Sequence, residues 1–113
     1  MKIIYIAHKI SGNVTANLEN IRQIVRDINI HCPEIVPFAP YWLDCHALDD
    51  NVPSERERGI KNDTELIKRG FIDEMWLCGD RISSGMQHEI NLAESLGIKV
   101  VSHITDDGSF LPF

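Results

Sequence analysis

The sequence lacks the cysteine pairs that mark small disulfide-bonded or zinc-bound domains. Its three cysteines, Cys32, Cys45 and Cys78, are odd in number and widely spaced, and none belongs to a CxxC pair. This pattern predicts neither a disulfide framework nor a structural metal site. We interpret Cys78, which lies in an apolar run, as a small core residue.

Positive charge is also scarce. Eleven Lys and Arg face seventeen Asp and Glu, which gives a net charge of −6 at neutral pH. No broad basic face can follow a phosphate backbone, so duplex nucleic acid is not an expected partner. A small anion can bind without much positive charge on the protein, because a few backbone N–H groups at a helix N-terminus hold one phosphate without a basic surface.

Long apolar runs are absent as well. The first run, within residues 1–7, is too short for a signal peptide, and no run approaches a membrane span. We therefore expect a cytoplasmic protein with no membrane partner. The composition, 43% hydrophobic and 25% charged over 113 residues, is typical of a globular protein and predicts a single domain over residues 1–113 with its own core.

Apolar, β-branched segments alternate with segments of helical periodicity. We expect strands at residues 2–7, 34–38, 72–78 and 98–103, and helices at residues 14–30, 54–69 and 83–97. Ser54 and Glu57 have the spacing of a capping box. The alternation predicts an α/β protein of flavodoxin-like, three-layer α/β/α architecture with a four- to five-stranded parallel sheet. Neither a GxGxxG fingerprint nor a P-loop is present.

The third expected helix carries an acidic residue beside its apolar face. Met86, Ile90, Ala93 and Gly97 recur at helical spacing and mark the side laid against the sheet, and Glu89 borders it. Glu89 is near the helix N-terminus, hence near the carboxyl edge of the preceding strand, where open parallel sheets bind ligands. The alternative is a surface glutamate that reaches solvent.

A second acidic residue interrupts the apolar stripe of the preceding helix. Asp63 follows Ile60 by three positions and precedes Ile67 by four. Such a violation of the binary pattern is expected at functional sites. The alternative is a structural pair with Lys61, Lys68 or Arg69.

Two loops carry further candidate residues. After the first strand, His8, Lys9 and Ser11 precede a helix and could hold an anion, although loops often have this composition. Residues 39–53 are irregular by pattern and rich in aromatic residues. Their rings could stack on a flat base or sugar, pack against a partner subunit or form a hydrophobic lid over the core. The apolar tail at residues 104–113 should dock on this subunit or a neighbour.

Three pieces of the sequence together resemble the nucleoside 2-deoxyribosyltransferase superfamily, which includes 2′-deoxynucleoside 5′-phosphate N-hydrolases and small phage-borne relatives of unassigned function. They are Ile4-Tyr5-Ile6-Ala7, Ile60-Lys61-Asn62-Asp63 and Ser83-x-Gly85-x-x-x-Glu89. Their order and spacing cover most of the chain. The resemblance selects the two carboxylates that the pattern argument had identified.

The resemblance implies roles for the matching residues. Glu89 would be the nucleophile, Asp63 would handle the proton of the leaving base, and Tyr5 would orient Glu89. Ser83 resembles the serine by which the nucleotide hydrolases contact a 5′-phosphate, with Gly85 and Met86 at the same helix N-terminus. The implied reaction is a retaining cleavage or transfer of an N-glycosidic bond, without metal or other cofactor, on a small-molecule nucleoside or nucleotide. The two carboxyl groups should lie roughly 5 Å apart.

The sequence also departs from the family. The family's first loop begins Ala-Gly, whereas Ala7-His8-Lys9 stands here, and His88 precedes the nucleophile where relatives often have an aromatic residue. The changed loop leaves open a non-catalytic nucleotide-binding protein, a sensor or sequestering protein, and a purely structural subunit is a further alternative. Since relatives complete their sites across a dimer, we expect a homodimer or higher homo-oligomer.

Overall fold

The computed structural model describes residues 1–110, which form a parallel sheet covered by helices on both faces. The described elements, in chain order, are β1 (Lys2–Ala7), α1 (Val14–His31), β2 (Ile35–Phe38), α2 (Tyr41–Ala47), α3 (Pro53–Lys68), β3 (Glu74–Leu77), α4 (Ser84–Ser95) and β4 (Lys99–Ser102). Within residues 1–110 the sheet has four strands in the order β2-β1-β3-β4, and every neighbouring pair is parallel. The predicted α/β fold with a parallel sheet is confirmed.

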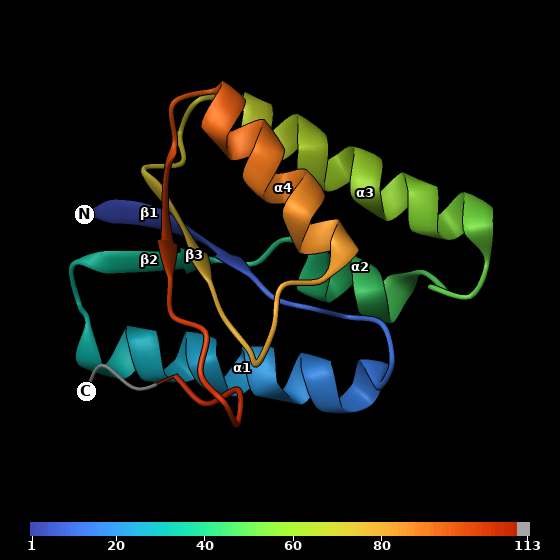
Figure 1. Cartoon of the computed structure of the whole chain (residues 1–113), viewed down its shortest axis with the longest axis horizontal. Coiled ribbons are helices and arrows are strands. Elements are labelled where there is room, and N and C mark those ends of the chain that lie inside the picture. Colours follow the sequence, from blue (N-terminus) through green and yellow to red (C-terminus); the bar gives the residue numbers. More distant parts are fainter. Residues whose placement is uncertain (111–113) are drawn as a thin grey trace.

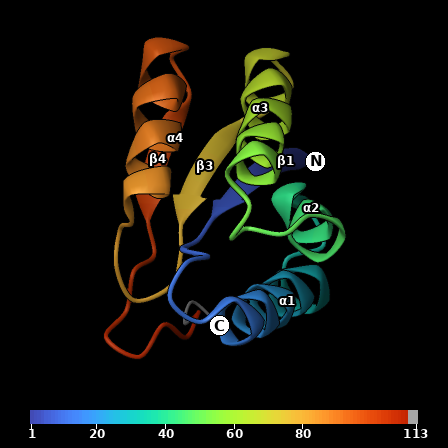
Figure 2. The same ribbon diagram turned by 90° about the vertical axis from the view of Figure 1, so that its right-hand side faces the viewer.

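The helices form the outer layers. Figure 1 shows α3 and α4 together on one face of the sheet and α1 on the other, and Figure 2 shows α2 at the edge between α1 and α3. Because the strands are parallel, all their carboxyl ends lie on one edge. The loops after β1 and β3 and the first turn of α4 meet there.

Strand β1 is central because both of its faces are apolar. Ile4, Tyr5, Ile6 and Ala7 are fully buried, and β1 pairs with β2 on one side and β3 on the other. The two-residue alternation of a strand separates its side chains. Tyr5 and Ala7 share a core cluster with Met86 and Ile90 of α4, while Ile4 and Ile6 pack with Ile24 and Ile28 of α1. Tyr5 therefore faces the helix that carries Glu89.

Helix boundaries differ from the prediction at two residues. Helix α3 begins at Pro53, whose missing N–H suits the first turn, and its N-cap is Val52, without a side-chain cap hydrogen bond. The predicted Ser54 capping box is therefore wrong. Gly97 does not pack on the sheet: it is exposed, has a φ of 73° and follows the end of α4.

The aromatic segment is not wholly irregular, as predicted, because it contains the short helix α2. Tyr41 is buried and its hydroxyl donates a hydrogen bond to the Ile6 carbonyl. The Trp42 indole N–H donates to the Leu18 carbonyl at 2.9 Å. The two rings are therefore part of a lid on the core, which was one of the alternatives predicted for this segment.

The described part of the tail docks on its own subunit. The Thr105 N–H donates to the Gly79 carbonyl at 3.1 Å, and the buried Phe110 ring stacks on Trp76 with centroids 5.7 Å apart. The predicted tail also includes residues 111–113, which lie outside the described residues.

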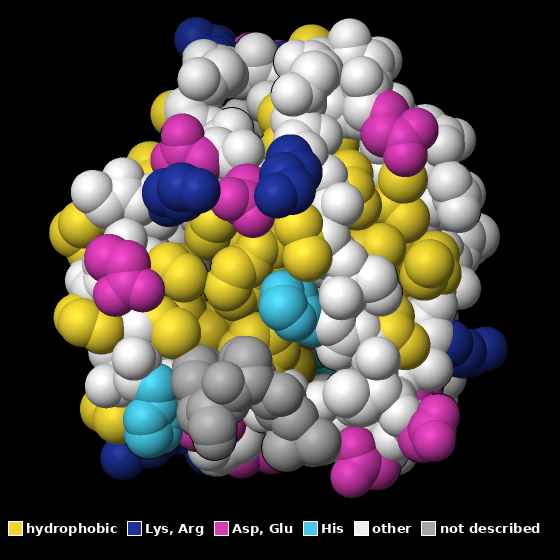
Figure 3. Space-filling view, turned by 60° about the vertical axis from the view of Figure 1, so that its left-hand side comes forward, with side chains coloured by type: hydrophobic (Ala, Val, Ile, Leu, Met, Phe, Trp, Pro, Cys, Tyr) yellow, Lys and Arg dark blue, Asp and Glu magenta, His cyan; other side chains and the backbone are white. Residues whose placement is uncertain are grey.

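Figure 3 shows that hydrophobic side chains remain at the surface of one face, around a histidine. The predicted homo-oligomer stays a prediction. No helix within residues 1–110 is long and apolar enough to cross a bilayer.

Replacing Gly79 by alanine should destabilise the fold. Gly79 has a φ of 95°, and a Cβ there would lie 3.0 Å from His8 Nε2. We expect a loss of about 1–3 kcal/mol from strain and displacement of the His8 ring. Urea unfolding measures it. The control is Gly59→Ala within α3, where a Cβ meets only Leu48 Cδ1 at 3.9 Å and should stabilise by roughly 0.5–1 kcal/mol. Equal effects in both variants would contradict this account.

Candidate active site

The site is organised by a hydrogen bond between β1 and α4. The Tyr5 hydroxyl donates to Oε2 of Glu89. The Tyr5 ring is held at the carboxyl half of β1 by contacts with Phe38 and Tyr41, with centroid distances of 6.3 and 5.9 Å. Burial, and then the nearby Glu89 and Asp63 carboxylates, raise the pKa of Tyr5 well above its usual value. The Tyr5 hydroxyl therefore keeps its proton, and its hydrogen bond orients the Glu89 carboxyl group.

Glu89 lies in the second turn of α4, one position before the buried Ile90. Burial raises its pKa to about 8, repulsion by Asp63 adds to this, and the Tyr5 hydrogen bond opposes it. The alternative of a solvent-exposed helix glutamate is wrong. Because desolvation penalises the charged form, it favours the protonated form of Glu89 at neutral pH.

Asp63 reaches the same site from α3. Its Oδ1 is buried and has no hydrogen-bond partner among the described residues. Burial, followed by repulsion from Asp44, raises the pKa of Asp63 to about 7. Among residues 1–110 no ion pair joins Asp63 to Lys61, Lys68 or Arg69, and Arg69 instead contacts Glu65 at 2.7 Å. The structural alternative for Asp63 is wrong.

Two adjoining cavities bring these residues together. The first has a volume of about 390 Å³ and includes Asp44 and Asp63, while the second has about 360 Å³ and includes Asp63 and Glu89. They share a lining of Arg56, Ile60, Asp63, Ser83, Ser84 and Gly85. These sizes suit a small organic ligand. Ile60, predicted to pack inward, is 45% exposed because it faces this space.

The N-terminus of α4 forms one wall of both cavities. Ser83 is the N-cap, and its Oγ accepts a hydrogen bond from the Met86 N–H at 3.2 Å. The Met86 side chain turns back to the Ser83 N–H at 3.5 Å and is buried in the core. A Cβ on Gly85 would meet only Ser83 Oγ at 3.9 Å, so the backbone there is open to a ligand.

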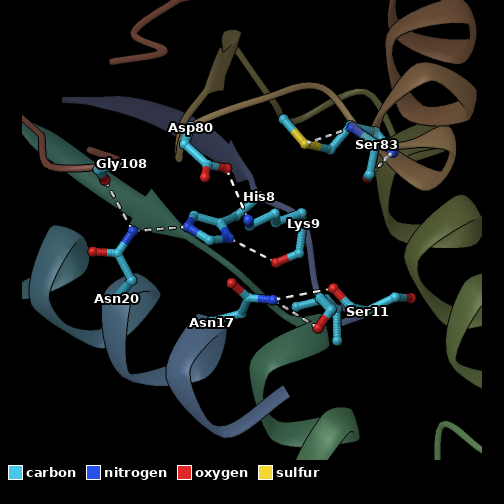
Figure 4. Close-up of polar contacts among 10 residues, drawn as sticks. His8, Lys9, Ser11, Asn17, Asn20, Asp80, Ser83 and Gly108 are labelled. Atoms are coloured by element: carbon cyan, nitrogen blue, oxygen red, sulfur yellow. Dashed lines mark hydrogen bonds and ion pairs between the residues drawn. The ribbon is translucent and has the colours of Figure 1, made fainter. Parts of the chain in front are cut away.

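Only part of the loop after β1 lines the two cavities. Figure 4 shows the polar contacts of this loop. His8 is 5% exposed, and its Nε2 accepts from the Asn20 amide at 2.9 Å while Nδ1 donates to the Lys9 carbonyl at 2.6 Å. Burial lowers the pKa of His8, so this ring, which lines the second cavity, is neutral. The Lys9 ammonium pairs with Asp80 at 2.8 Å and lines neither cavity, whereas Ser11 lines the first.

Several lining residues were not predicted from the sequence. Asp44, Arg56 and Arg81 are charged residues in a helix or loop whose pattern does not distinguish them from an ordinary solvated surface. Tyr41 was recognised only as one member of an aromatic segment. Within the described residues, no group of three or more His, Cys, Asp or Glu side chains is arranged to hold a metal ion.

Replacing Glu89 by glutamine should stabilise the protein above neutral pH. The pKa of Glu89 is 4.5 when unperturbed and about 8 when folded. The native state therefore binds more protons than the unfolded state between these values, so the wild type loses stability as pH rises through this window. Glutamine removes that loss and still accepts from Tyr5. We expect a gain of about 1–2 kcal/mol at pH 8.5, reduced from the full linkage value by access of water to the cavity.

Thermal unfolding from pH 4 to 9 measures this effect. The gain should vanish near pH 4, where both states of the wild type are protonated. The control is Glu94→Gln, an exposed position on the same helix. A gain that is the same at pH 4 and pH 8.5 would contradict the buried-acid account.

Comparison with known proteins gives one match. No curated protein and no solved structure matches the chain. A family model described as a domain of unknown function matches residues 2–103. This range contains all eight described helices and strands, from β1 to β4, together with Tyr5, Asp63 and Glu89. The chain therefore belongs to the DUF7768 family.

Proposed function

We propose that this protein cleaves the N-glycosidic bond of a 2′-deoxynucleoside or its 5′-monophosphate, with Glu89 as nucleophile, by hydrolysis or by transfer to a second base. The observation that carries the proposal is the Tyr5 hydrogen bond to Glu89 in a cavity that Asp63 also lines. Asp63 is a second carboxyl group, and no ion pair within residues 1–110 joins it to a cation. The resemblance of the three sequence pieces to the nucleoside 2-deoxyribosyltransferase superfamily supports the same assignment.

Two carboxyl groups suffice for a retaining displacement. A Glu89 oxygen forms a bond to C1′ as the bond from C1′ to the base nitrogen breaks, and the bonding electrons leave with the base. Protonated Asp63 gives its proton to that base. Water then attacks C1′, the Asp63 carboxylate takes a proton from the water, and Glu89 is released as a carboxylate.

The raised pKa values of the two acids limit the reactive form. It requires an ionised Glu89 and a protonated Asp63, whereas burial raises the pKa of both groups, to about 8 and about 7, and so favours the protonated form of each. Positive charge that develops on the deoxyribosyl group in the transition state favours the ionised Glu89.

The α4 N-terminus supports a phosphate on the substrate. The Ser83 hydroxyl and the first N–H groups of α4 can donate to an anion, and the helix dipole favours negative charge there. Arg56 and Arg81 add two cations to the lining of the first cavity. Arg56 approaches Asp50 only at 4.0 Å, and both guanidinium groups can form charge-assisted hydrogen bonds to phosphate oxygens.

The second candidate function is nucleotide binding without turnover, as in a sensor or sequestering protein. The burial that raises the pKa of Glu89 to about 8 favours it, since a protonated Glu89 binds a neutral sugar without attacking it. The same cavity and α4 N-terminus would serve both functions.

Release of free base, followed by chromatography, tests the proposal. The panel contains deoxynucleosides, ribonucleosides and the 5′-monophosphates of both, with Glu89→Ala beside the wild type. We expect wild type to release base from a deoxy substrate and Glu89→Ala to lose about two orders of magnitude or more. Glu94→Ala is the matched control and should keep full activity. If no substrate is turned over but a nucleotide raises the melting temperature, the enzyme proposal is rejected and nucleotide binding without turnover is supported.

Arg81→Gln tests the phosphate. Arg81 is exposed and has no ion pair among the described residues, so the fold should not depend on it. We expect KM to rise about tenfold for monophosphates and to stay unchanged for nucleosides. An equal change in KM for monophosphates and nucleosides would show that the Arg81 guanidinium does not contact the phosphate.

A further inference from the structure

Asp44 is a third acid of the site and has no role in the mechanism above. It lies in α2, which packs against α3, and its side chain lines the first cavity together with Asp63. The Asn62 amide, one position before Asp63, donates to Asp44 Oδ2 at 3.3 Å. The residue that precedes Asp63 on α3 therefore holds the Asp44 side chain against α3.

We propose that Asp44 is a positioning residue: its negative charge, held in place by Asn62, keeps a proton on Asp63 so that Asp63 can protonate the leaving base. This inference rests on the proposed function for the use of that proton. The placement of the proton itself can be measured without any substrate.

The other charged and titratable groups around Asp63 come from every element that surrounds the cavities. They are Tyr5 of β1, His8 of the β1–α1 loop, Tyr41 and Cys45 of α2, Asp50 of the α2–α3 connection, Glu55 and Arg56 of α3, Arg81 of the β3–α4 loop, and His88 and Glu89 of α4. Burial raises the pKa of Cys45 to about 11, so Tyr5 and Cys45 are neutral. Glu55 accepts from the Asp49 N–H at 3.1 Å, and Asp50 lies 4.0 Å from Arg56.

Within residues 1–110 no ion pair involves Asp44, and its side chain accepts a hydrogen bond from the neutral Asn62 amide. Its charge raises the pKa of Asp63 after the larger effect of burial, whereas Asp44 is not among the causes that raise the pKa of Glu89. Removing this charge should therefore shift the proton from Asp63 toward Glu89, which lowers the population of the reactive form.

The substitution Asp44→Asn removes the charge and keeps an oxygen that accepts from Asn62. Carbon-13 NMR of the aspartate carboxyl groups, without substrate, gives the titration midpoint of Asp63. We expect it to fall by about 0.5 pH unit or more in Asp44→Asn. Asp50→Asn is the matched control: it removes one negative charge from the same cavity lining and should move the midpoint less. Equal shifts, or no shift in Asp44→Asn, would overturn the proposal.

The pH profile of kcat/KM gives the second readout. The limb set by Asp63 should move to lower pH in Asp44→Asn by the same amount as the NMR midpoint, the maximum should fall, and the limb set by Glu89 should stay. An NMR shift with both limbs unmoved in an active enzyme would overturn the positioning role. An NMR shift in a protein without any turnover would support the placement of the proton by Asp44 and overturn the proposed reaction instead.

Discussion

The site depends on the burial of two carboxyl groups in one hollow beside the sheet. Water would stabilise their ionised forms, and the cavity replaces most of that water with Ile60, Ile67, Met86 and backbone. One hydroxyl, that of Tyr5, compensates Glu89, while Oδ1 of Asp63 has no partner among the described residues. The protonation of both carboxyl groups therefore depends on their burial and on nearby charge.

Packing and hydrogen bonds in the rest of the molecule keep the two carboxyl groups in place, although hydration and ionisation would draw them toward water. Strand β1 is buried from Ile4 to Ala7, which fixes Tyr5, and Tyr41 of the α2 lid hydrogen-bonds to the Ile6 carbonyl. On the far side of the loop, His8 is held between Asn20 and the Lys9 carbonyl, and Asn20 also donates to the Gly108 carbonyl at 2.9 Å. The sequence departure at His8-Lys9 thus joins the first loop to α1 and the tail rather than bringing two cations to the cavity.

Much of this was accessible from sequence pattern. Period-two and period-3.6 hydrophobicity predicted β1, α1, α3 and α4 to within a few residues. The same pattern identified Asp63 as an acid on an apolar stripe and Glu89 as an acid at the border of one. Helix α2 was missed because it has seven residues and begins after Pro40 in a segment with turn composition. Asp44, Arg56 and Arg81 were missed because a charged side chain that lines a cavity and one that faces solvent have the same local pattern. Only tertiary contacts separate them.

The most direct test of a nucleophilic Glu89 is mass spectrometry of the intact protein after incubation with a 2′-fluoro-arabinonucleoside 5′-monophosphate. Fluorine next to C1′ destabilises the oxocarbenium-like transition state of both steps, so the glycosyl-enzyme should accumulate. The account predicts an added mass equal to the fluorinated sugar phosphate, located on the peptide that contains Glu89 and absent from Glu89→Gln. An adduct on another residue, or base release from this substrate without any adduct in wild type, would contradict it.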